Sequence, residues 1–89
     1  MLAIRGEVTG KVQGVFFRKN TKIQADMLEL AGWVCNTKAG TVAFLIVGEE
    51  SAIAAMQQWL QQGPRLARVD KVDCETCPIE NLTGFTINH

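Results

Sequence analysis

Residues 2–30 read LAIRGEVTGKVQGVFFRKNTKIQADMLEL, and the spacing of their apolar side chains changes part-way along. Residues 2–9 alternate between apolar and polar positions, which is the period of a half-buried strand. Residues 10–16 contain two glycines and follow no regular period. Beyond them, apolar and small side chains recur every three or four residues, as on one face of a helix. We therefore predict a strand over Leu2–Thr9, a loop over Gly10–Phe16 and a helix from Phe17 to Leu30 that ends near Gly32.

The remainder of the chain predicts a hairpin, a second helix and two further strands. In the first of these two strands the alternation slips between Val69 and Val72, which predicts a β-bulge. The elements are a strand over Trp33–Cys35 that ends at Asn36, a turn over Thr37–Gly40, a strand over Thr41–Val47, a helix that begins at Glu49–Ser51 and ends at Gly63–Pro64, a strand near Ala67–Glu75 and a short strand over Phe85–Ile87.

The order of these elements is βαββαβ with a short terminal strand, which predicts an α+β fold. We expect a ferredoxin-like α/β sandwich in which two helices cover one face of a mostly antiparallel sheet. With 89 residues, 47% of them hydrophobic, the chain can build one core, so residues 1–89 are predicted to form a single domain. A right-handed crossover brings the ends of the first two strands to the same end of the sheet. The loop Gly10–Phe16 and Asn36 are therefore expected to meet there.

Charge and hydropathy exclude several classes of function. Nine Lys and Arg residues balance nine Asp and Glu residues, so the chain lacks the long-range positive field of proteins that bind nucleic acids or anionic membranes. The longest apolar run, Val42–Val47, is far too short to span a bilayer. The first residues show no secretory-signal pattern, and Cys35, Cys74 and Cys77 are too few for a disulfide framework. We expect a monomeric cytoplasmic protein with reduced thiols.

The loop Gly10–Phe16 joins a strand to a helix N-terminus, where unpaired backbone N–H groups face an anion that binds there. Arg18, in the first helical turn, adds a guanidinium, and together these donors can bind three oxygens of a phosphate. The alternative is a solvent-filled turn with a surface arginine. Asn36 also has two interpretations: its amide holds a water molecule opposite the bound anion, or the residue simply begins the following turn. The residues alone leave both pairs of alternatives open.

Two longer motifs run through these residues. Residues 10–18, GKVQGVFFR, resemble the phosphate-loop signature of acylphosphatases, and residues 32–37, GWVCNT, followed by Gly40–Val42 resemble their second signature. The resemblance extends over essentially the whole chain. It implies an α/β sandwich that hydrolyses the carboxyl–phosphate anhydride bond of acyl phosphates without a metal or other cofactor. It also implies that Arg18 binds phosphate, that Asn36 positions water and that the phosphate loop comprises Lys11, Val12, Gln13, Gly14, Val15 and Phe16.

The resemblance also accounts for the side chains that the motifs lack. His89 is the only histidine and the loop contains no Asp or Glu, so no obvious general base or nucleophile is present. The carboxylate released from an acyl phosphate has a pKa of about 4 and leaves without a general acid, so positioning and charge stabilisation suffice. Inorganic phosphate is then expected as product and competitive inhibitor. The alternative function is that of a noncatalytic domain of this fold, which binds a phosphorylated ligand or a protein partner.

Other features of the sequence carry less weight. Cys74 and Cys77 have the spacing of a redox motif, but they lie late in a predicted strand instead of at a helix start, which disfavours a redox role. No set of residues has the spacing of a metal site. The core is expected to include Trp33, Ile53, Met56 and Trp59.

Overall fold

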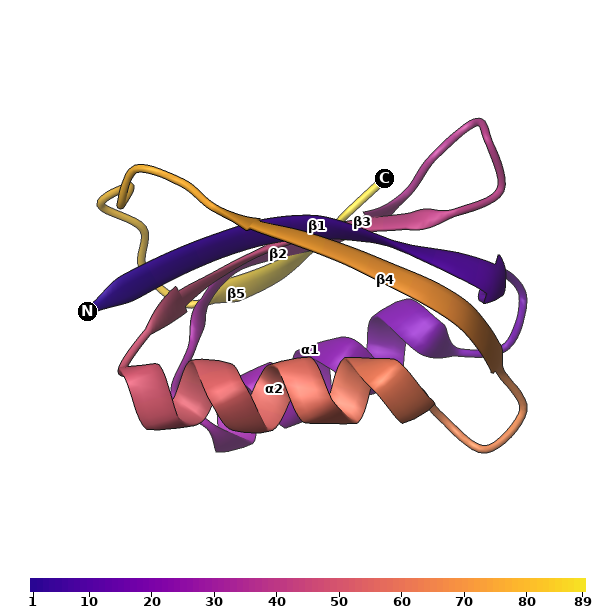
Figure 1. Cartoon of the computed structure of the whole chain (residues 1–89), viewed down its shortest axis with the longest axis horizontal. Helices are drawn as coiled ribbons and strands as arrows, with labels where there is room; N and C mark the ends of the chain where they lie inside the picture. The colour runs from indigo at the N-terminus through magenta and orange to yellow at the C-terminus, as the bar shows by residue number, and fades with distance from the viewer.

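The computed structural model describes residues 1–89 and contains one five-stranded sheet with two helices on one of its faces (Figure 1). The strand order is β4-β1-β3-β2-β5, and every neighbouring pair is antiparallel except β2 and β5. The predicted ferredoxin-like α+β sandwich is confirmed. Its elements are β1 (Leu2–Lys11), α1 (Phe17–Met27), β2 (Ala31–Asn36), β3 (Val42–Gly48), α2 (Glu50–Gln62), β4 (Arg68–Thr76) and β5 (Phe85–Asn88).

The main core lies between the sheet and the helices and follows from the spacing of the sequence. It contains 15 buried hydrophobic residues, contributed by both helices, by the strands and by the loop after β1. The rings of Phe17 and Trp59, 5.7 Å apart between their centroids, join the two helices. The helical stripes predicted from the sequence are confirmed, because α1 buries Phe17, Thr21 and Ala25 while α2 buries Ile53, Met56 and Leu60.

Pairing with β4 extends β1 to Lys11, beyond the predicted end at Thr9. The register shifts between Thr9 and Gly10, where Asp70 is the extra residue of a bulge in β4. The bulge predicted in this strand is thereby confirmed. Gly10 lies so close to β4 that a Cβ atom there would come within 2.1 Å of the Arg68 carbonyl oxygen. This close pairing fixes the point at which the chain leaves the sheet.

The end of α1 differs from the prediction, because the helix stops at Met27. Glu29 has a φ of 57°, and the N–H group of Leu30 donates to the carbonyl oxygen of Ala25 at 2.9 Å, as in a Schellman ending. The prediction of a helix that runs to Leu30 and ends near Gly32 is wrong. Gly32 lies in β2, where a Cβ atom would come within 1.9 Å of a carbonyl oxygen of β3. The glycine therefore serves the close approach of two strands and has no part in capping.

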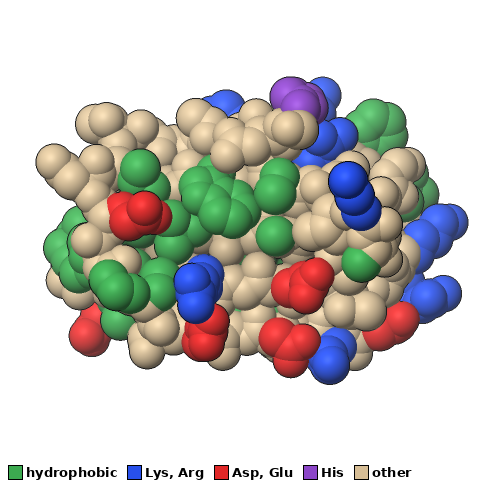
Figure 2. Space-filling model, turned by 90° about the horizontal axis from the view of Figure 1, so that it is seen from above, with side chains coloured by type: hydrophobic (Ala, Val, Ile, Leu, Met, Phe, Trp, Pro, Cys, Tyr) green, Lys and Arg blue, Asp and Glu red, His purple; other side chains and the backbone are tan.

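The second face of the sheet carries no helix, and we call it the open face. Figure 2 looks onto it and shows hydrophobic side chains gathered between charged ones. Ala3, Leu45 and Val47 are buried there, with Trp33 partly buried against them. Trp33, which was expected in the core, is only partly buried and packs on this face, because Val34 is the residue of this pair that points toward the helices. Neither helix has the length and apolar character needed to cross a bilayer.

Candidate active site

A cavity of about 360 Å³ opens where residues 12–16 meet the end of β2. The loop and Asn36 were predicted to approach each other, and they share this cavity. The first turn of α1 and the end of β5 complete its walls. The lining residues are Val12, Gly14, Phe16, Phe17, Arg18, Lys19, Asn36, Ile87 and His89.

The loop of residues 12–16 presents free backbone donors at the start of α1. Its N–H groups donate to no acceptor in the protein, and no side chain caps the helix. Gly14 and Phe16 have φ values of 74° and 63°, so the chain enters the left-handed region twice within three residues. Successive N–H groups in such a loop, at the positive end of a helix dipole, form a concave site for an anion.

Arg18 carries a positive charge that no carboxylate neutralises. The four ion pairs of the protein involve other residues. Arg68, for example, donates to Asp70 at 3.0 Å, and this hydrogen bond raises the pKa of Arg68. Arg18 instead contacts His89, with Nη1 3.2 Å from Nδ1. Because a guanidinium only donates, Nδ1 accepts, which leaves the remaining N–H groups of Arg18 free for an anion.

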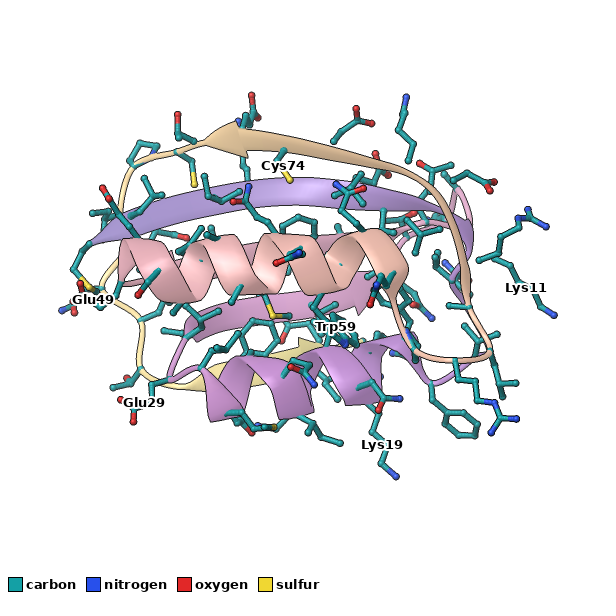
Figure 3. All side chains as sticks on the ribbon, turned by 60° about the horizontal axis from the view of Figure 1, so that its bottom comes forward. Lys11, Lys19, Glu29, Glu49, Trp59 and Cys74 are labelled. Carbon is teal, nitrogen blue, oxygen red and sulfur yellow. The ribbon has the colours of Figure 1, made fainter.

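The charge of the molecule is distributed unevenly although its sum is zero. Figure 3 shows Lys11 at the end of the molecule where β1 passes into the loop, and Glu29 and Glu49 at the opposite end. Lys19 lies in the cavity wall beside Arg18. Lys11, Arg18 and Lys19 therefore gather positive charge at the site end although the net charge of the chain is zero.

Asn36, the last residue of β2, has an unused hydrogen-bond acceptor. Its Oδ1 is the only buried side-chain nitrogen or oxygen atom that has no partner in the protein. Leaving such a group unsatisfied costs about 1–3 kcal/mol. The residue itself lines the cavity, which places its side-chain amide beside any water molecule that binds there.

The side chain of Gln13 ties the loop to the hairpin that follows Asn36. Its Nε2 donates to the carbonyl oxygens of Thr37 and Thr41, each at 2.9 Å. The hydroxyl oxygens of these two threonines are 2.6 Å apart, and the Thr41 hydroxyl donates to the Glu7 carboxylate. Because each hydroxyl has one proton, Thr37 is the donor to Thr41. Hydrogen bonds therefore connect Glu7 of β1 to the two threonines of the hairpin. Gln13 connects the same hairpin to the loop.

Comparison with known proteins gives the family of this chain. The sequence model of the acylphosphatase family matches residues 4–87. The chain belongs to the acylphosphatase family. It is 43% identical over 86 residues to the acylphosphatase of Pseudomonas paraeruginosa, a match that covers 97% of this chain and 94% of that protein.

Solved acylphosphatase structures have the same fold. The crystal structure of acylphosphatase from Bacillus subtilis matches with a TM-score of 0.97 at 33% identity, and the match covers 100% of both chains. The acylphosphatase from Coxiella burnetii matches with a TM-score of 0.95 at 38% identity, covering 98% of this chain and 92% of that one. The family likeness therefore holds in sequence and in three dimensions.

The residues predicted from the acylphosphatase signatures divide into two groups. Those whose side chains or backbone line the cavity are Val12, Gly14, Phe16, Arg18 and Asn36. Lys11 is exposed at the end of β1, Gln13 bonds to the hairpin and Val15 is buried in the core. None of these three residues lines the cavity.

The sequence of this acylphosphatase family member did not predict that His89 lies beside Arg18. The parallel pairing of β5 with β2 places Asn88 opposite Cys35, so the next residues, His89 and Asn36, lie at the same end of the sheet. Periodicity predicts a terminal strand but does not say which strand it joins. Glu7 and the two threonines were also missed, because ordinary strand and turn residues give no motif signal.

Proposed function

We propose that the phosphoryl group of an acyl phosphate binds in the cavity, held by the N–H groups of residues 12–16 and by Arg18, and that Asn36 positions the attacking water. As a member of its family, the chain is an enzyme that hydrolyses the carboxyl–phosphate anhydride bond of acyl phosphates. One observation carries the proposal. Free N–H groups, an arginine without a carboxylate partner and an unpartnered amide oxygen meet at one cavity.

The chemistry needs positioning more than acid or base catalysis. The water oxygen attacks phosphorus while the bond from phosphorus to the acyl oxygen breaks, and the carboxylate leaves with the bonding electrons. Its pKa of about 4 lets it depart unprotonated. Asn36 Oδ1 accepts a hydrogen bond from the water but is no base, so one water proton passes to a phosphoryl oxygen and the other stays on the new P–OH group. The products are the carboxylate and inorganic phosphate.

Charge stabilisation in this scheme comes from the protein itself. The backbone N–H groups and the guanidinium of Arg18 face the three non-bridging oxygens, which carry the charge in the transition state. Such fixed donors stabilise the negative charge on the phosphoryl oxygens, as a metal ion does in many phosphoryl-transfer enzymes. We therefore expect the reaction to need no metal or other cofactor.

The same donors define the partners that we propose. Inorganic phosphate fits the site as well as the phosphoryl group does, so it acts as a competitive inhibitor. We propose that the protein acts as a monomer. We place the protein in the cytoplasm, because its three cysteines are free thiols, which suits a reducing compartment. With balanced charge, it binds a small substrate and no nucleic acid.

The test is release of phosphate from acetyl phosphate by the purified chain, beside Arg18→Ala. We expect turnover by the wild type with competitive inhibition by phosphate, and much slower turnover with weaker inhibition by phosphate in the variant. A wild-type protein that binds phosphate but leaves acetyl phosphate intact would instead be a noncatalytic phospho-ligand domain.

A further inference from the structure

His89 lines the cavity, and the hydrolysis described above makes no use of it. Its Nδ1 lies 3.2 Å from Nη1 of Arg18, the side chain that we propose binds the phosphoryl group. The other charged side chains of the cavity wall, Arg18 and Lys19, keep their charge at every pH near neutrality. The imidazole is therefore the one side chain of the wall that changes charge in this range.

The two protonation states of the imidazole suit different states of the cavity. In the neutral form, Nδ1 accepts a hydrogen bond from Arg18, as the structure shows. In the protonated form both ring nitrogens donate, so this hydrogen bond is lost and two positive charges lie side by side. An imidazole changes between the two forms at about pH 6.5. The empty cavity therefore favours the neutral form.

A phosphoryl dianion in the cavity reverses this preference. In the proposed scheme the dianion contacts Arg18, so it also lies beside the imidazole that Arg18 contacts. An opposite charge within about 4–6 Å favours the charged form of a titratable group. No Asp or Glu lines the cavity, so no carboxylate of the wall competes with the phosphoryl oxygens for the imidazolium. The bound state therefore favours a protonated imidazole that donates to a phosphoryl oxygen.

The titratable groups around His89 do not produce the same effect. The elements packed against β5 are α1 and β2. Besides Arg18 and Lys19, α1 contributes Lys22, which forms an ion pair with Asp26 at 2.9 Å. The strand β2 contributes Cys35, which lies on the open face because residues of a strand alternate between faces. Carboxyl groups ordinarily titrate well below neutrality and thiols at about pH 8.5, so neither is expected to titrate with the imidazole.

We propose that His89 is a further binding residue for the phosphoryl group, and that it takes up a proton from solvent when the dianion binds and releases it when phosphate leaves. The proposal rests on the proposed function, which places the phosphoryl group beside Arg18. Coupling between two ligands is reciprocal, so proton uptake on binding means that protons strengthen binding. The affinity of the site for the dianion should therefore rise as the pH falls through the range of the imidazole.

Nuclear magnetic resonance tests the proton uptake directly. His89 is the only histidine, so the imidazole C–H signals belong to it alone. The wild type is titrated between pH 5 and 8.5, once without ligand and once with inorganic phosphate in saturating excess. We expect phosphate to raise the midpoint of the titration by about one pH unit. Equal midpoints with and without bound phosphate would overturn the proposal.

The variant His89→Gln tests the effect on affinity. Its amide oxygen can still accept a hydrogen bond from Arg18, but the side chain cannot gain a proton. The titration of phosphate itself cancels when the inhibition constants of wild type and variant are compared at the same pH. We expect almost equal inhibition at pH 8 and about fivefold stronger inhibition of the wild type at pH 5.5. A ratio that is the same at every pH would show a contact without proton uptake and would overturn the proposal.

Asn88→Gln is the matched control, because Asn88 precedes His89 in the chain but does not line the cavity. It should behave as the wild type at every pH. The outcome for the proposed function is read separately, from release of phosphate from acetyl phosphate. A wild type that shows the midpoint shift without hydrolysis would contradict the proposed function and leave the proton-coupled anion site standing. Failure to bind phosphate at all would overturn both.

Discussion

Gln13 Nε2 donates to the carbonyl oxygen of Thr37 at 2.9 Å, although 24 residues separate the two in the sequence. The bond joins the loop that we propose holds phosphate to the turn that begins directly after Asn36. This hydrogen bond therefore fixes the proposed phosphate site relative to the proposed position of the attacking water. Small errors in the placement of reacting groups cost large factors in rate, so this contact bears directly on catalysis.

Replacement of Gln13 tests whether the link between loop and hairpin contributes to catalysis. Gln13→Ala should lower kcat/KM by about tenfold or more, because the loop loses its link to the hairpin. Gln13→Glu should lower kcat/KM further at neutral pH, because an ionised carboxylate cannot donate to the two carbonyl oxygens. Its kcat/KM should rise partly as the pH falls and the carboxyl group gains a proton. The measurement is the pH profile of kcat/KM for both variants. Gln61→Glu, on the exposed face of α2, is the control for added charge.

Arg18→Lys keeps the positive charge but loses the planar guanidinium that we propose contacts two phosphate oxygens. Most of the activity should therefore be lost, with Arg18→Ala losing more. Steady-state rates with acetyl phosphate check the order, and circular dichroism checks that helix content is unchanged. Near-normal rates in the lysine variant would mean that Arg18 supplies only a general positive field.

The structure shows which parts of fold and site the sequence pattern could predict. The junction from β1 to α1 was predictable because the hydrophobic period changes there, and the crossover rule then brought Asn36 to the loop. The role of Gly32 could not be predicted, because a glycine after a helix gives the same sequence signal whether it caps the helix or lets two strands approach closely. The contact between His89 and Arg18 depends on β5 pairing with β2, which is a long-range choice that no local pattern records.

Glu29 offers a test of the helix ending that the sequence did not predict. It is exposed, forms no ion pair and has a φ of 57°. Glu29→Gly should relieve the left-handed strain and stabilise the fold by about 1 kcal/mol, which corresponds to a rise in Tm of about 4–8 °C for a domain of this size. Thermal melting followed by circular dichroism measures it. Glu29→Ala is the control, because alanine carries the same strain and should give no such rise.

Chelation tests the source of charge stabilisation. Because N–H groups and the Arg18 guanidinium are proposed to face the phosphoryl oxygens, excess EDTA should leave kcat and KM for acetyl phosphate unchanged. Assays with chelator, and then with Mg²⁺ or Zn²⁺ added back, make the comparison. Activity that disappears with EDTA and returns only with a metal ion would refute the scheme.

The division of roles between Arg18 and Asn36 is the central claim. In the proposed scheme Arg18 contacts phosphate in the ground state and in the transition state, so Arg18→Ala should weaken inhibition by phosphate as well as turnover. Asn36 is proposed to hold only the water, so Asn36→Ala should lower kcat by about 100-fold or more while phosphate still inhibits almost as well as in the wild type. Thermal midpoints of both variants control for unfolding.

The inhibition constant of inorganic phosphate, measured side by side for Arg18→Ala and Asn36→Ala, tests this claim most directly. The account predicts a large rise for Arg18→Ala and almost none for Asn36→Ala. An equal rise in the two folded variants would show that Asn36 binds phosphate and does not position the water.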